Sequence, residues 1–112
     1  MDELSFKLED FEGPLDLLLT LIAKHKLNIL DIEIASLLDQ YMEFINKVDK
    51  EDLDSRSEFL EMAARLVYIK SVSLLPKYEE EAEELKTQLV GELMEYSICK
   101  LAAEDLGALA KE

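Results

Sequence analysis

The side chains best suited to chemistry in this chain are its one histidine, its one cysteine and its many carboxylates. His25 sits between Lys24 and Lys26 at the end of a predicted helix, where positive charge complements the helix dipole. We therefore assign it no catalytic or metal-binding role. Cys99 has no second cysteine or histidine near it in the sequence, and we interpret it as a small buried or half-buried residue rather than a reactive thiol.

The carboxylates do not form a catalytic pattern either. Most of them occupy helix positions that face water, and the sequence offers no second apolar cleft that would raise the pKa of one of them. A glycine-rich phosphate loop, a CxxC pair and an HExxH motif are all absent from the sequence. We predict a protein that is not an enzyme and that has no cofactor and no metal site.

Composition narrows the class of protein further. The 112 residues include 26 acidic and 12 basic side chains, a formal net charge of −14, so direct contact with nucleic acid is disfavoured. The longest apolar run, 17–23, is too short to span a membrane, and the N-terminus lacks the pattern of a signal peptide. A single cysteine cannot form an internal disulfide, which agrees with a reducing compartment. We expect a cytoplasmic location.

Apolar residues recur with the period of a helix, which predicts an all-α fold with three helices in the first 76 residues. The first begins at Pro14, which suits the first helical position because its missing N–H costs nothing there. The second opens at Asp31 or Glu33 and continues to about Val48. The short charged turn that follows predicts that the second and third helices lie antiparallel and that the three form a small bundle.

The third helix, 55–75, has more apolar surface than an ordinary surface helix needs. Ser55 and Glu58 have the spacing of a capping box, and Pro76 marks the end. One face of the helical wheel carries the residues that we expect in the core of the chain, namely Phe59, Met62, Leu66 and Ile69. A second apolar face, with small residues in its middle, is available to something else and consists of Leu60, Ala64, Val67 and Ser71.

Both ends of the chain are predicted to lie outside this bundle. Residues 4–8 alternate as a short extended strand, which either packs on the helices or pairs with a partner or a second copy. The glutamate-rich segment from residue 79 is a solvated linker or the exposed start of a helix. From Leu85 a long amphipathic helix runs nearly to the end. We therefore predict a helical domain, 1–78, and a second segment, 79–112.

Four blocks of this sequence resemble the sequence of a known protein family. They are DFEGPLDLLLTLI at 10–22, DIEIASLLDQYMEFI at 31–45, EFLEMAARLVYIKSVSLLP at 58–76 and LVGELMEYSICKLAAEDL at 89–106. Together they resemble the N-terminal half of segregation and condensation protein A, the bacterial and archaeal kleisin family. FEGPLDLLL and IKSVSLLP are the most specific parts, and their order and spacing are those of the family. The last block has fewer charged residues than is common there, and the winged-helix domain of a full-length member is absent, so we expect a fragment.

The resemblance implies a bridging function in chromosome condensation and segregation. In the family, the N-terminal helical domain docks on the coiled-coil neck beside one ATPase head of the Smc dimer. The central segment binds a dimer of segregation and condensation protein B, and the C-terminal domain caps the other Smc head, which closes a ring around DNA. This implies a cytoplasmic protein that is associated with the nucleoid through the complex.

The resemblance also implies which residues bind these partners. The docking mode of the family implies that the surface facing the Smc neck consists of Leu60, Ala63, Ala64, Val67, Lys70, Ser71 and Leu74. Contact with segregation and condensation protein B, or with the flank of the domain itself, comes from Leu89, Leu93 and Tyr96.

The residues alone leave other functions open. A self-associating helical module would bury the apolar face of one copy on that of another, with the segment 4–8 paired across a two-fold axis. The chain could instead act as an acidic decoy that occupies a basic surface of another protein. Only the net charge supports this function, and such binding would depend strongly on salt. We rank the adaptor first, followed by self-association, the decoy and an enzyme.

Overall fold

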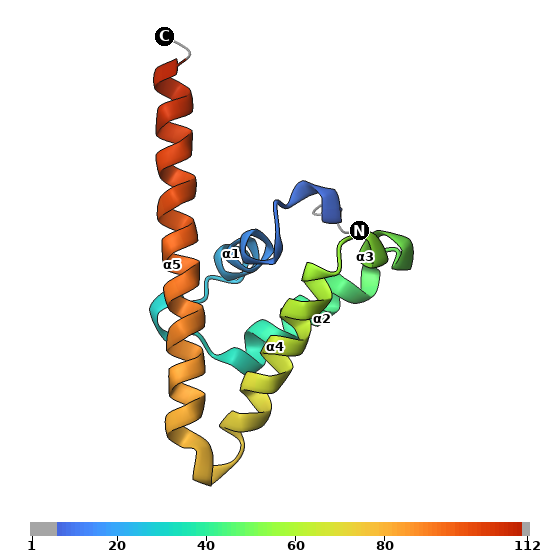
Figure 1. Ribbon diagram of the computed structural model, residues 1–112, viewed down its shortest axis with the longest axis vertical. Coiled ribbons are helices and arrows are strands. Elements are labelled where there is room, and N and C mark those ends of the chain that lie inside the picture. The colour runs from blue at the N-terminus through green and yellow to red at the C-terminus, as the bar shows by residue number, and fades with distance from the viewer. Residues whose placement is uncertain (1–6, 111–112) are drawn as a thin grey trace.

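The computed structural model describes residues 7–110, with side chains as far as residue 105. Five α-helices and three short 3₁₀ helices follow one another in this part of the chain: η1 (Leu8–Asp10), α1 (Pro14–Lys24), η2 (Ile29–Asp31), α2 (Ile34–Lys47), α3 (Lys50–Ser55), α4 (Glu58–Ser73), η3 (Pro76–Tyr78) and α5 (Glu79–Ala110). No strand occurs within residues 7–110, and the all-α class is confirmed. The molecule measures 55 × 30 × 28 Å, and its length reflects α5, which runs past the other helices (Figure 1).

The start of α1 agrees with the sequence prediction. Pro14 occupies the first turn, and Gly13 ahead of it is extended. Asp16 also lies in the first turn, where a carboxylate is favoured by the positive end of the helix dipole. The helix ends at Lys24, and Lys26 has a φ of 55°, a left-handed conformation that lets the chain turn towards η2 and α2.

α2 and α4 pack against each other and run in opposite directions, as the short connection between them predicts (Figure 1). The hydroxyl of the fully buried Tyr41 donates a 2.7 Å hydrogen bond to the carbonyl oxygen of Phe59 in the first turn of α4. Burial, with a smaller contribution from the charge of Glu58, raises the pKa of Tyr41. The hydroxyl therefore keeps its proton, and this bond ties α2 to α4.

The start of α4 differs from the sequence prediction. The segment before it forms a short helix of its own, α3, in which the hydroxyl of Ser55 donates to the carbonyl oxygen of Asp52 at 2.9 Å. α4 begins only at Glu58, and no side chain forms a capping hydrogen bond there. The predicted capping box was wrong because Ser55 completes the preceding helix.

Arg56, between α3 and α4, holds the loop that precedes α1. Its guanidinium donates hydrogen bonds to the carbonyl oxygens of Leu8 at 3.1 Å, Phe11 at 2.9 Å and Glu12 at 2.8 Å. The same group lies 4.8 Å from the ring centroid of Phe59. One side chain thus joins the start of the described chain to the start of α4.

α5 is a fourth member of the bundle over its first half and a projecting arm over its second. Pro76 ends α4 as predicted, and after η3 the glutamate-rich segment is already helical, so the exposed start of a helix is the alternative observed. Leu89 and Leu93 have no exposed surface and belong to the common core. From Leu101 to residue 105 every side chain is exposed, and Figure 1 shows α5 projecting past the bundle there.

The core draws on all of the longer helices. The fully buried side chains of largest volume are Tyr41, Phe59, Leu17, Leu18, Ile32, Leu37, Leu66, Ile69, Leu89 and Leu93. Core residues therefore come from both sides of residue 78, and the division of the chain at that point stays a prediction. Leu8, at the end of the predicted strand, lies in η1, whereas residues 4–6 lie outside the described residues.

Candidate partner-binding surface

α4 is apolar on two sides, and only one of them is covered. The inward side lies in the core through Phe59, Leu66 and Ile69, which have no exposed surface, and through Met62 and Val72. Their spacing of three or four residues gives one continuous stripe along the helix. This is the core face that the helical wheel predicts.

The outward side of α4 carries exposed apolar residues. Leu60, Val67 and Leu74, each seven residues from the next, are 42%, 46% and 72% exposed. Ala64 and Ser71 lie between them and are exposed as well. The hydroxyl of Ser71 donates to the carbonyl oxygen of Val67 at 2.9 Å, which satisfies its donor within the helix. Small residues between larger ones allow a second helix to approach closely. We call these five residues the outward stripe.

The two other residues predicted for this surface lie beside the outward stripe. Ala63 is only 8% exposed and belongs to the core, so it is not accessible to a partner in this conformation. Lys70 is half-buried. The contact of these seven residues with a partner stays a prediction, and their exposure favours the five of the outward stripe.

The apolar surface extends further than the sequence pattern indicates. Leu75 and Tyr78, each 47% exposed, continue it past the end of α4. Tyr68 is 53% exposed, and its hydroxyl donates to a carboxylate oxygen of Glu81 on α5 at 3.2 Å. The surface predicted from the sequence ends at Leu74 and includes none of these three residues.

An ion pair fixes the side of α4 that meets α5. Arg65 donates two hydrogen bonds to the two carboxylate oxygens of Glu92, at 2.9 and 2.6 Å. This bidentate geometry is the strongest that an arginine and a carboxylate adopt. The hydrogen bonds from Arg65 hold the pKa of Glu92 below its usual value. α4 is thus covered by the core on one side and joined to α5 on another, which leaves the outward stripe to solvent.

The residues predicted on α5 do not form one exposed surface. Leu89 and Leu93 have no exposed surface and belong to the core, and their contact with a partner stays a prediction. Tyr96 is half-buried. The exposed apolar side chains of α5 are instead Ile98, at 62%, and Leu101, at 60%. The sequence pattern missed them because it could not show where the bundle ends along the helix.

A buried carboxylate anchors the middle of α5. Asp16 is 5% exposed, and its two oxygens accept from the ammonium of Lys100 at 2.6 Å and from the backbone N–H of Glu12 at 3.2 Å. The hydroxyl of Tyr96 donates to the carboxylate of Glu12. The hydrogen bond to Asp16 raises the pKa of Lys100, and burial raises that of Tyr96. These contacts join α5 to the start of α1.

Residues 21–112 match the family described as segregation and condensation protein ScpA. The chain belongs to this family. A relative from Listeria innocua serovar 6a, named Segregation and condensation protein A, is 49% identical, and the match covers 95% of this chain and 46% of the relative. Relatives of the same name are 50% identical in Caldanaerobacter subterraneus subsp. tengcongensis and 45% identical in Clostridium acetobutylicum, covering 92% of this chain in each case and 44% and 43% of those relatives. The chain spans less than half the length of these ScpA relatives.

In this ScpA-family chain, the histidine and the cysteine that were first considered for chemistry are both exposed. His25 is exposed after the end of α1. Cys99 is exposed on α5, although the next residue, Lys100, contacts Asp16 of α1, so its predicted partial or full burial was wrong. In the described part of the chain, no three His, Cys, Asp or Glu side chains are grouped so that they could hold a metal ion. None of the described helices is both long and apolar enough to cross a membrane.

Proposed function

We propose that this chain is the docking part of a kleisin subunit that bridges an Smc ATPase dimer in chromosome condensation and segregation and that catalyses no reaction itself. Membership of the ScpA family supports the role in condensation and segregation. The observation that carries the docking role is the outward stripe, whose three large apolar residues are exposed on a helix that the core already holds from its other side. The proposed site of action is the cytoplasm, at the nucleoid.

The outward stripe fits a partner that is itself made of helices. Leu60, Val67 and Leu74 repeat every seven residues, which is the period at which coiled-coil helices present apolar side chains to each other. Burying one apolar side chain completely contributes about 1.5–3 kcal/mol, and these side chains still have roughly half of their surface to bury. The proposed partner is therefore the coiled-coil neck beside the Smc head, with Lys70 at the rim of the contact.

The projecting arm of α5 provides a second surface. We assign the recruitment of segregation and condensation protein B to this arm and the turns just before it, through Leu101 of the arm and through Ile98 and the half-buried Tyr96 ahead of it. An isolated helical segment of about ten residues is marginal in water. A partner that covers this arm would therefore also stabilise it. Leu89 and Leu93 would take part only if α5 left the core.

The docking surface can be tested by titrating an Smc fragment that contains head and neck into the chain, with calorimetry as the readout. Val67→Glu puts a charge in the middle of the outward stripe, and we expect at least roughly 100-fold weaker binding because that charge would be buried without a partner. Leu30→Glu, at a leucine of η2 that is 69% exposed and lies outside the stripe, is the matched control and should bind normally. Unchanged binding by Val67→Glu, or an equal loss in both variants, would contradict the assignment.

A further inference from the structure

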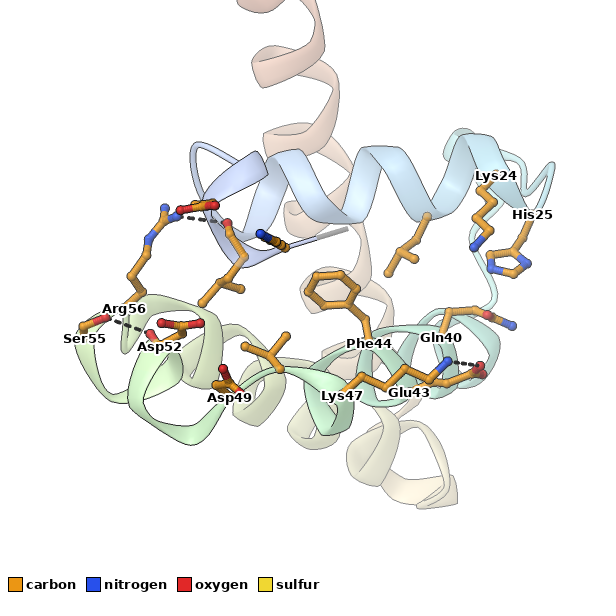
Figure 2. Close-up of a pocket in the computed structure, with 15 residues that line it drawn as sticks. Lys24, His25, Gln40, Glu43, Phe44, Lys47, Asp49, Asp52, Ser55 and Arg56 are labelled. Atoms are coloured by element: carbon orange, nitrogen blue, oxygen red, sulfur yellow. Dashed lines mark hydrogen bonds and ion pairs between the residues drawn. The ribbon is translucent and has the colours of Figure 1, made fainter. Parts of the chain in front are cut away.

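A cleft of about 860 Å³ opens between α1, α2, α3 and η1, and charges of both signs line it (Figure 2). Lys24 and His25 lie on the same side of the cleft as Glu43, and Arg56 lies on the side of Asp52. Basic and acidic side chains are thus mixed on both sides, so charge does not select an occupant for this cleft.

The flank of the outward stripe that faces α5 is acidic. Glu61 and Tyr68 directly follow two residues of the stripe and therefore lie about 100° further around the helix. The hydroxyl of Tyr68 donates to Glu81 of α5 at 3.2 Å, so this flank is the one beside α5. Glu84, about one turn further along α5, points within about 60° of Glu81. Glu61, Glu81 and Glu84 are all exposed, and the charge of Glu81 raises the pKa of Tyr68.

The nearby cations do not neutralise this flank. Arg65 also points towards α5, but its two side-chain hydrogen bonds go to Glu92 at 2.9 and 2.6 Å. Lys77, in the connection between α4 and α5, is exposed and stands against five glutamates in the first six residues of α5. Within residues 7–105, Glu61 and Glu84 take part in no ion pair. Their charge is therefore available to a partner that lies on the outward stripe.

The opposite flank of α4 has a different charge. Lys70, three residues after Val67, lies about 60° from it in the other sense around the helix. Ala63, seven residues before Lys70, carries no charge and belongs to the core. On α4 the outward stripe is therefore bordered by carboxylates towards α5 and by an ammonium group on the other side.

We propose that the helical partner of the outward stripe carries a row of lysine or arginine side chains along the edge that faces α5. This inference rests on the proposed docking function and names the chemistry of its partner. Such a row would meet Glu61 on α4 and Glu81 and Glu84 on α5. Charges at the rim of an interface determine the rate and the orientation of docking more than its affinity. The start of α5 thus acts as an acidic guide that orients the partner on the stripe.

A matched pair of charge reversals tests this guide. Glu81 and Glu83 are both exposed in the first turns of α5, but they lie about 160° apart around the helix, and only Glu81 contacts α4. An Smc fragment with head and neck is titrated into each variant, with calorimetry as the readout. At about 50 mM salt we expect roughly 5–20-fold weaker binding by Glu81→Lys and a change within about twofold by Glu83→Lys. At about 500 mM salt the two variants should differ by no more than about twofold, because salt screens exposed charges.

A second variant separates charge from the lost hydrogen bond of Tyr68. Glu84→Lys removes no hydrogen bond or ion pair within residues 7–105, so it should weaken binding at low salt in the same direction as Glu81→Lys. Equal effects of Glu81→Lys and Glu83→Lys, or tighter binding by Glu84→Lys, would overturn the basic partner and leave the docking function standing. An absence of binding by the natural chain would overturn the docking function, and this inference with it.

Discussion

The inward face of α4 and its outward stripe are built from similar side chains but lie in opposite environments. Leu66 has no exposed surface, whereas Val67, the next residue, is 46% exposed. Adjacent residues of a helix point about 100° apart, so a helix can serve its own core and a second partner at once. The comparison teaches that the apolar residues of one helix have to be divided by face before their contribution to folding is judged.

The largest effect should come from truncating the inward face. Leu66→Ala removes three buried carbon atoms and leaves a cavity, so we expect the free energy of unfolding to fall by about 2–5 kcal/mol. Val67→Ala, one position further on, should change it by no more than about 0.5 kcal/mol. Urea unfolding followed by circular dichroism measures both values. Similar losses in the two variants would mean that the two faces are not distinct.

A smaller effect is expected from substituting Arg56, which precedes α4 and holds the loop before α1 through hydrogen bonds. Arg56→Ala removes three hydrogen bonds from a charged donor, and because the group is partly exposed we expect a loss of about 2–3 kcal/mol in the free energy of unfolding. The exposed Lys77 gives a control, since Lys77→Ala should change little. Folded Arg56→Ala should still bind the Smc fragment, and weaker binding would show that the two sides are coupled.

The smallest effect concerns the pair that joins α4 to α5. The folded pKa of Glu92 lies below its unfolded value, so the stabilisation is present above the unfolded pKa, about 4.3, and is lost as pH falls through the folded pKa. We expect Glu92→Gln to lower the melting temperature at pH 7 and to show a smaller further decline below pH 4 than the natural chain. Parallel curves of melting temperature against pH would show that this pair makes no net contribution.

The sequence was a good guide to elements whose signals are local. Pro14 and Pro76 mark helix boundaries through the backbone alone, and the period of the apolar residues separated the two faces of α4. Each of these signals depends only on residues that are close together in the sequence, so it can be interpreted without knowledge of the rest of the fold.

Other features depend on contacts between distant parts of the chain. The hydrogen bonds of Arg56 reach residues 44 to 48 positions earlier, and no local pattern indicates them. Leu89 and Leu93 follow an amphipathic pattern, but such a pattern does not show whether the helices that cover it belong to the same chain. The exposure of Cys99 depends on which side of α5 faces α1, and the residue that contacts Asp16 of α1 is its neighbour Lys100.

The most direct test of the outward stripe as a docking surface is the mass of the chain in solution. Light scattering behind size exclusion would be applied to the chain alone and to its mixture with an Smc fragment that contains head and neck. We predict a monomer of 12.8 kDa alone and a stable complex in the mixture. A dimer alone that forms no complex with the fragment would contradict this account, because a second copy would then cover the outward stripe.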